Sequence, residues 1–201
     1  MRICFFGDSF TNGTGDDEAL GWVGRVSARA RHEGRDVTSY NLGIRRDTSA
    51  DVAGRWRSEA ERRLPPIYRH EGLLAFSFGA NDCADDEHGG PRVPIKRAIA
   101  NTELILSEAS SFAPTIMVGP APIQGEAADR RARALSEAQA ELCARIGVPF
   151  LAIFDFVAGC EAWRRDTQRG DGVHPNKAGY AALADFVWQW PAFHAWLDKS
   201  R

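Results

Sequence analysis

The sequence predicts a three-layer α/β domain in which helices cover both faces of a parallel sheet. Short apolar runs, rich in β-branched and aromatic residues, alternate with longer segments whose apolar residues recur at helical spacing. Alternation of this kind is typical of parallel sheets with helices on both faces. The chain has 201 residues, of which 44% are hydrophobic and 26% charged, and contains no repeat or low-complexity linker. We therefore expect one domain over residues 1–201.

The strands are expected where the apolar runs occur. Their length and composition suit strands that are buried on both faces. The runs are residues 3–6, 37–42, 73–78, 115–118 and 150–154.

The helices are expected between these runs. Asp47, Thr48 or Ser49 can cap a helix whose apolar side includes residues 52–64, and Asn176 can cap the last long helix. Apolar residues at spacings of three and four predict two further helices, over residues 95–109 and 135–146. The aromatic tail of residues 189–201 is expected to pack on the domain or on a partner subunit, which leaves homo-oligomer formation open.

Composition excludes several classes of function. The formal net charge of −2 gives no general attraction to nucleic acid, and no apolar run reaches the length needed for membrane insertion. The four cysteines show no CxxC spacing, so neither a zinc site nor a disulfide scaffold is expected. The segment before Gly7 is too short for a signal peptide, which favours a cytoplasmic protein. We expect no metal and no organic cofactor.

Polar residues suited to acyl transfer follow the predicted strands. Ser9 follows the first strand, Gly43 the second and Asn81 the third, while Asp171 and His174 lie just before the last helix. The carboxyl ends of parallel strands meet at one edge of a sheet, where such folds bind ligands. We therefore expect these residues to lie close together.

The residue types fit a serine hydrolase. A serine hydroxyl needs a base to remove its proton, and the base needs a partner that fixes its tautomer. His174 is the best base in the chain, and Asp171 precedes it by three residues. The oxyanion of the tetrahedral intermediate needs donors aimed at it, which the N–H groups of Gly43 and Ser9 and the amide of Asn81 can supply.

The blocks Gly7-Asp8-Ser9, Gly43, Gly79-Ala80-Asn81-Asp82 and Asp171-Gly172-Val173-His174-Pro175 occur in the order found in SGNH, or GDSL-type, hydrolases, and the sequence resembles that family. The resemblance implies a flavodoxin-like five-stranded sheet in the order 2-1-3-4-5. It also implies Ser9 as nucleophile, His174 as base, Asp171 as the triad acid, and Gly43 and Asn81 as oxyanion donors.

Two features depart from the family pattern. Phe10 stands where Leu is usual, and Arg45-Arg46 follow Gly43 and Ile44 where many members have a further Gly. The second departure can bring a guanidinium to the rim of the site and so change the acyl or alcohol preference.

Other interpretations exist for single residues. Ser9 can cap a helix, His174 can be a surface histidine, and Asn81 can form an Asx turn. Asp8 is expected to be structural. These interpretations lose weight because the four blocks coincide.

The predicted function is two-step hydrolysis of small or short-chain acyl esters through an acyl-Ser9 intermediate. Within the same family, carbohydrate O-deacetylation, thioester cleavage and lysophospholipid hydrolysis are alternatives. A non-catalytic module that binds a small ligand is the alternative from another class.

Overall fold

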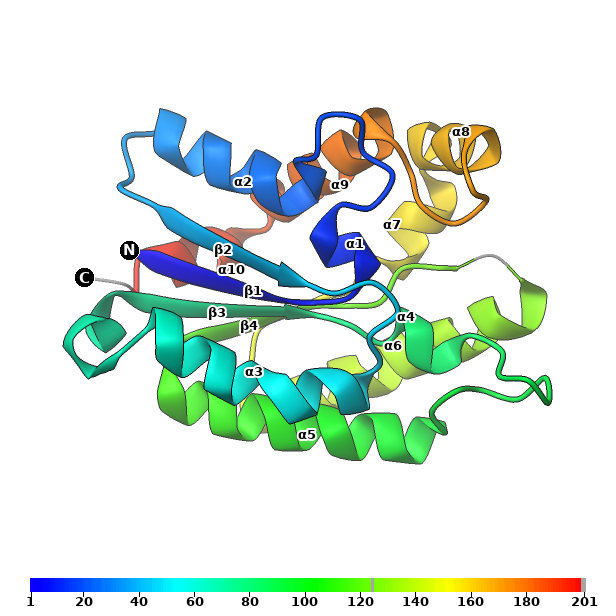
Figure 1. The fold of residues 1–201 in the computed structure, drawn as a ribbon, viewed down its shortest axis with the longest axis horizontal. Helices are drawn as coiled ribbons and strands as arrows, with labels where there is room; N and C mark the ends of the chain where they lie inside the picture. The colour runs from blue at the N-terminus through cyan, green and yellow to red at the C-terminus, as the bar shows by residue number, and fades with distance from the viewer. Residues whose placement is uncertain (124, 200–201) are drawn as a thin grey trace.

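The computed structural model describes residues 1–123 and 125–199. A five-stranded parallel sheet in the order β2-β1-β3-β4-β5 forms its centre, as the resemblance implied. Helices cover both faces, with α2, α9 and α10 on one side and α3, α5 and α6 on the other (Figure 1). The fold class and the strand order expected from the sequence are confirmed.

The elements follow one another along the chain as strand–helix units. The strands are β1 (Arg2–Gly7), β2 (Thr38–Gly43), β3 (Gly72–Ser77), β4 (Thr115–Val118) and β5 (Phe150–Leu151). The helices are α1 (Ser9–Asn12), α2 (Gly21–His32), α3 (Ser49–Arg63), the 3₁₀ helix η1 (Pro66–Glu71), α4 (Ala80–Cys83), α5 (Ile95–Phe112), α6 (Glu126–Ile146), α7 (Phe154–Gly159), α8 (Glu161–Arg169), α9 (Lys177–Gln189) and α10 (Pro191–Leu197).

The fifth strand is shorter than the sequence predicted. We expected residues 150–154 to be extended, but β5 ends at Leu151 and Phe154 begins α7. Leu151 pairs with Val118, the last residue of β4. Beyond that pair the neighbouring strand offers no further ladder partner, so the apolar residues that follow are buried through a helix instead.

The central strand β1 divides the core in two. Ile3 and Phe5 face the helices α2, α9 and α10, whereas Cys4 and Phe6 face α3 and α5. Each of the four residues is at most 1% exposed. Because side chains alternate along a strand, a continuous apolar run places buried groups on both faces. This double burial fixes β1, and with it the start of α1.

Helix starts follow the caps that the sequence offers. Thr48 caps α3 and forms a capping box with Asp51, and Asn176 caps α9 by accepting the N–H of Lys177. These two caps hold the segments next to Gly43 and His174 at the carboxyl edge of the sheet.

The aromatic tail lies within the core. Phe193 and Trp196 of α10 are each 1% exposed, and the indole N–H of Trp196 donates to the carbonyl of Pro114 at 2.9 Å. The tail therefore packs on the domain itself, while Ser200 and Arg201 lie outside the described residues. Among the described helices, none is long and apolar enough to cross a membrane.

Candidate active site

Ser9 begins a short helix directly after the central strand. The Asp8 carboxylate accepts the N–H of Phe10 at 3.0 Å and so caps α1. Gly7 permits this turn, because a Cβ there would lie 2.0 Å from the carbonyl oxygen of Ser77 and 2.2 Å from the hydroxyl of Thr11. The Ser9 side chain is thereby fixed at the carboxyl edge of the sheet.

Ser9, His174 and Asp171 form one hydrogen-bonded chain. Ser9 Oγ lies 2.8 Å from His174 Nε2, and His174 Nδ1 lies 2.6 Å from Asp171 Oδ2. The other oxygen of Asp171 accepts the backbone N–H groups of Val173 and His174 at 2.9 and 2.8 Å. Ser9 and His174 are 165 positions apart in the sequence, yet the structure places them and Asp171 in direct contact.

The surroundings of Asp171 keep its carboxyl group ionised. Partial burial opposes ionisation, but hydrogen bonds from the backbone and side chain of His174 and from the Val173 N–H outweigh it and lower the pKa of Asp171 from 3.8 to about 2. A carboxylate at this position favours the tautomer with a proton on Nδ1, which leaves Nε2 free to accept the Ser9 hydroxyl proton.

The imidazole of His174 is also held by aromatic packing. The Phe10 ring lies 5.4 Å from the imidazole ring and 5.6 Å from the ring of Trp163, measured between centroids. Phe10 is 5% exposed. Phe10 therefore supplies apolar support behind Ser9, at the position where Leu is usual in the sequence pattern.

Hydrogen bonds join the loop after α1 to the start of α9. The amide of Asn176 donates to the Asp17 carboxylate at 2.7 Å and accepts the Asp17 N–H at 3.2 Å. The Tyr180 hydroxyl donates to the carbonyl of Thr14 at 2.8 Å. Because His174 lies just before α9, these contacts fix its distance from Ser9.

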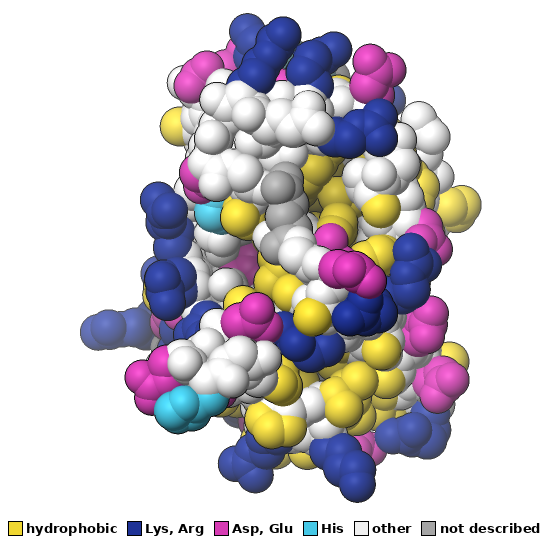
Figure 2. Space-filling view, turned by 90° about the vertical axis from the view of Figure 1, so that its right-hand side faces the viewer, with side chains coloured by type: hydrophobic (Ala, Val, Ile, Leu, Met, Phe, Trp, Pro, Cys, Tyr) yellow, Lys and Arg dark blue, Asp and Glu magenta, His cyan; other side chains and the backbone are white. Residues whose placement is uncertain are grey.

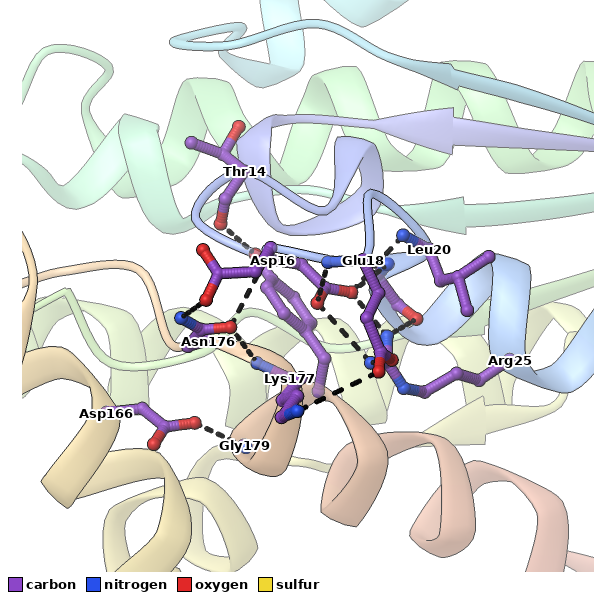
Figure 3. Close-up of polar contacts among 12 residues, drawn as sticks. Thr14, Asp16, Glu18, Leu20, Arg25, Asp166, Asn176, Lys177 and Gly179 are labelled. Atoms are coloured by element: carbon purple, nitrogen blue, oxygen red, sulfur yellow. Dashed lines mark hydrogen bonds and ion pairs between the residues drawn. The ribbon is translucent and has the colours of Figure 1, made fainter.

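Asp16 lies within the same loop and holds its backbone through hydrogen bonds. Its carboxylate accepts the N–H groups of Glu18 and Gly21 at 3.1 and 2.7 Å and pairs with Arg25 (Figure 3). Burial disfavours the charge, but Arg25 and these N–H groups hold the pKa of Asp16 below its ordinary value. The sequence analysis missed this network, since nothing in the spacing links residues 14–25 to residues 176–180.

Asn81 lies in the site with half of its amide in use. Its Nδ2 donates to the carbonyl of Asp47 at 3.0 Å. A side-chain amide has two N–H donors, and the second has no acceptor among the described residues. The contact with Asp47 orients the amide and leaves one donor for a ligand.

Gly43 is the last residue of β2, and its N–H is already hydrogen-bonded. Its N–H donates to the Asn41 side chain at 3.1 Å, and a Cβ at this position would lie 2.2 Å from the backbone nitrogen of Asn12. The glycine thus allows β2 and α1 to approach closely. Of the residues described, those lining the pocket next to Ser9 do not include Gly43 but do include Arg46.

Arg46 has an unusual backbone conformation for a side chain of its size. Its φ is +70°, in the left-handed region that favours glycine. The carbonyl of Arg46 accepts from the Arg92 guanidinium at 2.9 Å, and Arg55 bridges the Asp47 carboxylate and the Gly7 carbonyl at 2.7 and 3.0 Å. The turn is thereby held rigidly against β1.

Asp82 connects the Gly79-Ala80-Asn81-Asp82 segment to the start of α3. It is fully buried, its carboxylate accepts the N–H of Ser49 at 2.9 Å, and the Ser49 hydroxyl also donates to it. Burial raises the pKa of Asp82, while the bonds from Ser49 oppose the rise. Sequence reasoning offered Ser49 as a possible helix cap but did not predict its contact with Asp82, because that contact spans 33 residues.

The pocket over Ser9 has a volume of about 350 Å³ and opens at the carboxyl edge of the sheet. Figure 2 looks onto this edge and shows basic side chains around a partly apolar hollow. A second cavity of about 580 Å³, lined by α6, α7 and α8, shares no lining residue with the first. In the described part of the chain, no group of three or more His, Cys, Asp or Glu residues is arranged to hold a metal.

Comparison with known proteins identifies the family of the chain. The model of the GDSL-like lipase/acylhydrolase family matches residues 5–182, so the chain belongs to that family. It is an ester-hydrolysing enzyme. A search of curated protein sequences finds no significant match.

Solved structures share the fold at low sequence identity. Axe2, an acetylxylan esterase from Geobacillus stearothermophilus, matches with a TM-score of 0.73 at 19% identity, over 93% of this chain and 92% of its own. A lipase/acylhydrolase from Enterococcus faecalis matches with a TM-score of 0.71 at 23% identity, over 92% and 94%. The psychrotrophic esterase EstA from a Pseudoalteromonas species matches with a TM-score of 0.73 at 19% identity, over 98% of both chains.

Proposed function

We propose that the enzyme is a serine esterase that cleaves small acyl esters through an acyl-Ser9 intermediate. The observation that carries the proposal is the unbroken chain of contacts from Ser9 Oγ through both ring nitrogens of His174 to Asp171, at 2.8 and 2.6 Å. Both distances lie within the range required for proton transfer between a nucleophile and its base.

The reaction proceeds in two acyl-transfer steps. Ser9 Oγ attacks the ester carbonyl while His174 Nε2 takes the hydroxyl proton, and His174 then returns this proton to the leaving alcohol. A water molecule, deprotonated by the same nitrogen, attacks the acyl-enzyme; the bond from the acyl carbon to Ser9 Oγ breaks, His174 returns the proton to Ser9 Oγ, and the acid is released. Asp171 stays ionised throughout and stabilises the imidazolium that forms in each step.

The oxyanion is stabilised by N–H groups around Ser9. Ser9 is the first residue of α1, and the first N–H groups of a helix have no acceptor within the helix. The second N–H of Asn81 supplies another donor. Gly43 can contribute only if its N–H leaves Asn41, whereas Arg46 already lines the pocket, so we assign the third donor to the backbone N–H of Arg46.

The substrate class is a small or short-chain ester. The volume of about 350 Å³ suits a small acyl group better than a long lipid chain. Deacetylation of a carbohydrate is the second candidate, because Axe2, which has the same fold, is described as an acetylxylan esterase.

The experiment that tests this function is covalent labelling combined with turnover. A fluorophosphonate should label the wild-type enzyme and leave the Ser9→Ala variant unlabelled, because Ser9 is the nucleophile. Initial rates over 4-nitrophenyl esters from acetate to palmitate, with acetylated sugars alongside, should be highest at acetate or butyrate. A folded protein that neither labels nor turns over any ester would support a non-catalytic binding module instead.

A further inference from the structure

The rim of the active-site pocket carries more positive charge than its surroundings neutralise. Arg45, Arg46 and Arg92 line the pocket together with Asp85, which is a carboxylate. Asp85, however, is paired with Arg131. Within the described residues, no carboxylate lies within ion-pair distance of Arg45, Arg46 or Arg92. The whole chain has a formal net charge of −2, so this local excess does not follow from composition.

Neighbouring groups neutralise the positive charges of the three arginines to different extents. Arg92 is half-buried, donates to the Arg46 carbonyl at 2.9 Å and interacts electrostatically with Asp51 and Asp82. Arg45 and Arg46 are exposed. The neighbouring carboxylate on their own loop, Asp47, is taken by Arg55 at 2.7 Å. The guanidinium groups of Arg45 and Arg46 are therefore available to a ligand.

The backbone conformation of Arg46 also supports a role for its guanidinium in binding a ligand. A non-glycine residue in the left-handed region is strained, and a glycine at this turn would avoid the strain. The backbone N–H that the oxyanion needs is the same in glycine and arginine, so it does not account for the side chain. A role for the guanidinium in binding substrate does account for it.

We propose that the physiological ester carries an anionic oxyacid group, such as a carboxylate or a phosphate, which Arg45 and Arg46 bind beside Ser9. Guanidinium groups bind planar carboxylates and phosphates through paired, charge-assisted hydrogen bonds. This inference rests on the proposed esterase function and adds the charge of its substrate. The anion belongs either to the acyl part or to the alcohol part of the ester.

Two matched pairs of esters test the inference. One pair, 4-acetoxybenzoate and its methyl ester, differs by a negative charge on the leaving group. The other pair, the 4-nitrophenyl monoester of adipic acid and the corresponding methyl diester, differs by a negative charge on the acyl group. The measured quantity is the ratio of kcat/KM for the anionic ester to that for the neutral ester within each pair. Comparing this ratio between enzyme variants cancels the intrinsic reactivity of the esters.

The variants separate charge at the site from charge elsewhere. Arg45→Gln should lower the ratio about tenfold or more in at least one pair, as expected for loss of a charge-assisted contact, and leave turnover of the neutral ester unchanged. Arg45→Lys should restore part of the ratio. Arg46→Gly keeps the turn and its N–H and should lower the ratio in the same pair. Arg145→Gln removes an exposed charge on α6 and serves as the matched control, with no change expected.

The outcomes distinguish this inference from the proposed function. If neither Arg45→Gln nor Arg46→Gly lowers the ratio beyond the Arg145→Gln control in either pair, the anionic substrate is refuted while esterase activity stands. If the wild-type enzyme hydrolyses none of the four esters and resists fluorophosphonate, the proposed function itself fails.

Discussion

Replacing Asp171 by asparagine changes one atom and should reverse the tautomer of His174. Asp171 Oδ1 accepts two backbone N–H groups, from Val173 and His174, at 2.9 and 2.8 Å. An asparagine has a single acceptor oxygen, which this pair of donors will hold. The amide nitrogen then takes the position of Oδ2, 2.6 Å from His174 Nδ1, and donates a hydrogen there. The ring proton is displaced to Nε2, which can no longer accept a proton from Ser9.

The expected loss of kcat follows from this change in the tautomer of His174. A triad whose base is held in the wrong tautomer typically loses a factor of about 10⁴ in kcat, with its geometry intact. At about 1.36 kcal/mol per factor of ten, this corresponds to about 5.4 kcal/mol of transition-state stabilisation. KM for a neutral ester should change little, because Asp171 supports the base rather than the substrate.

The assay is the steady-state hydrolysis of 4-nitrophenyl acetate at pH 8, with Ser9→Ala as the baseline for background activity. A midpoint temperature of thermal unfolding for Asp171→Asn within a few degrees of the wild-type value would establish that the fold is intact. A variant that folds and retains more than about a tenth of wild-type kcat would refute the assignment of Asp171 as the group that fixes the tautomer.

Three further predictions concern residues around Ser9. Asn81→Asp should lower kcat about 100- to 1000-fold, because it removes the free amide donor, and kcat on a short ester checks this. Gly43→Ala should cost about 3 kcal/mol of unfolding free energy in urea, because its Cβ would lie 2.2 Å from the Asn12 nitrogen; an unchanged midpoint would contradict the close approach. Burial raises the pKa of Asp8 from 3.8 to about 7, so the folded state retains a proton that the unfolded state loses, and stability falls as pH rises through this window. Asp8→Asn, which can still cap α1, should therefore raise the unfolding free energy more at pH 8 than at pH 5, whereas an equal effect at both would refute the raised pKa.

The fold could be predicted because its signal is local. The strands β1, β3 and β4 are short apolar runs that are almost wholly buried, whereas β2 is mostly polar and buries only Leu42. The helix starts at Thr48 and Asn176 carry side chains that cap through neighbouring N–H groups. The end of β5 could not be predicted from residues 150–154, since it depends on where β4 stops offering partners. Local sequence identifies an apolar segment but not the length of its neighbour.

The candidate site could be predicted in part. Ser9, Asn81, Asp171 and His174 were identified because each follows or precedes an element of the predicted sheet, and the structure brings them together. Gly43 was singled out because glycine permits close approach, and the structure shows such an approach to the backbone of Asn12, while a role of Gly43 as an oxyanion donor stays a prediction. Sequence alone does not reveal which backbone a missing Cβ accommodates.

Conformational and electrostatic costs gather at the active edge of the sheet. Arg46 has a φ of +70°, Asp8 is buried with a raised pKa, and the buried Asp82 also has its pKa raised by burial. Glycine at position 46 would avoid the left-handed strain, and asparagine at position 8 would avoid the burial of a charge. The fold tolerates them because the aromatic core around Phe5, Phe76 and their neighbours supplies burial on both faces of the sheet. Several local rules are therefore broken at the edge that holds the candidate site, which is expected when selection acts on a site as well as on stability.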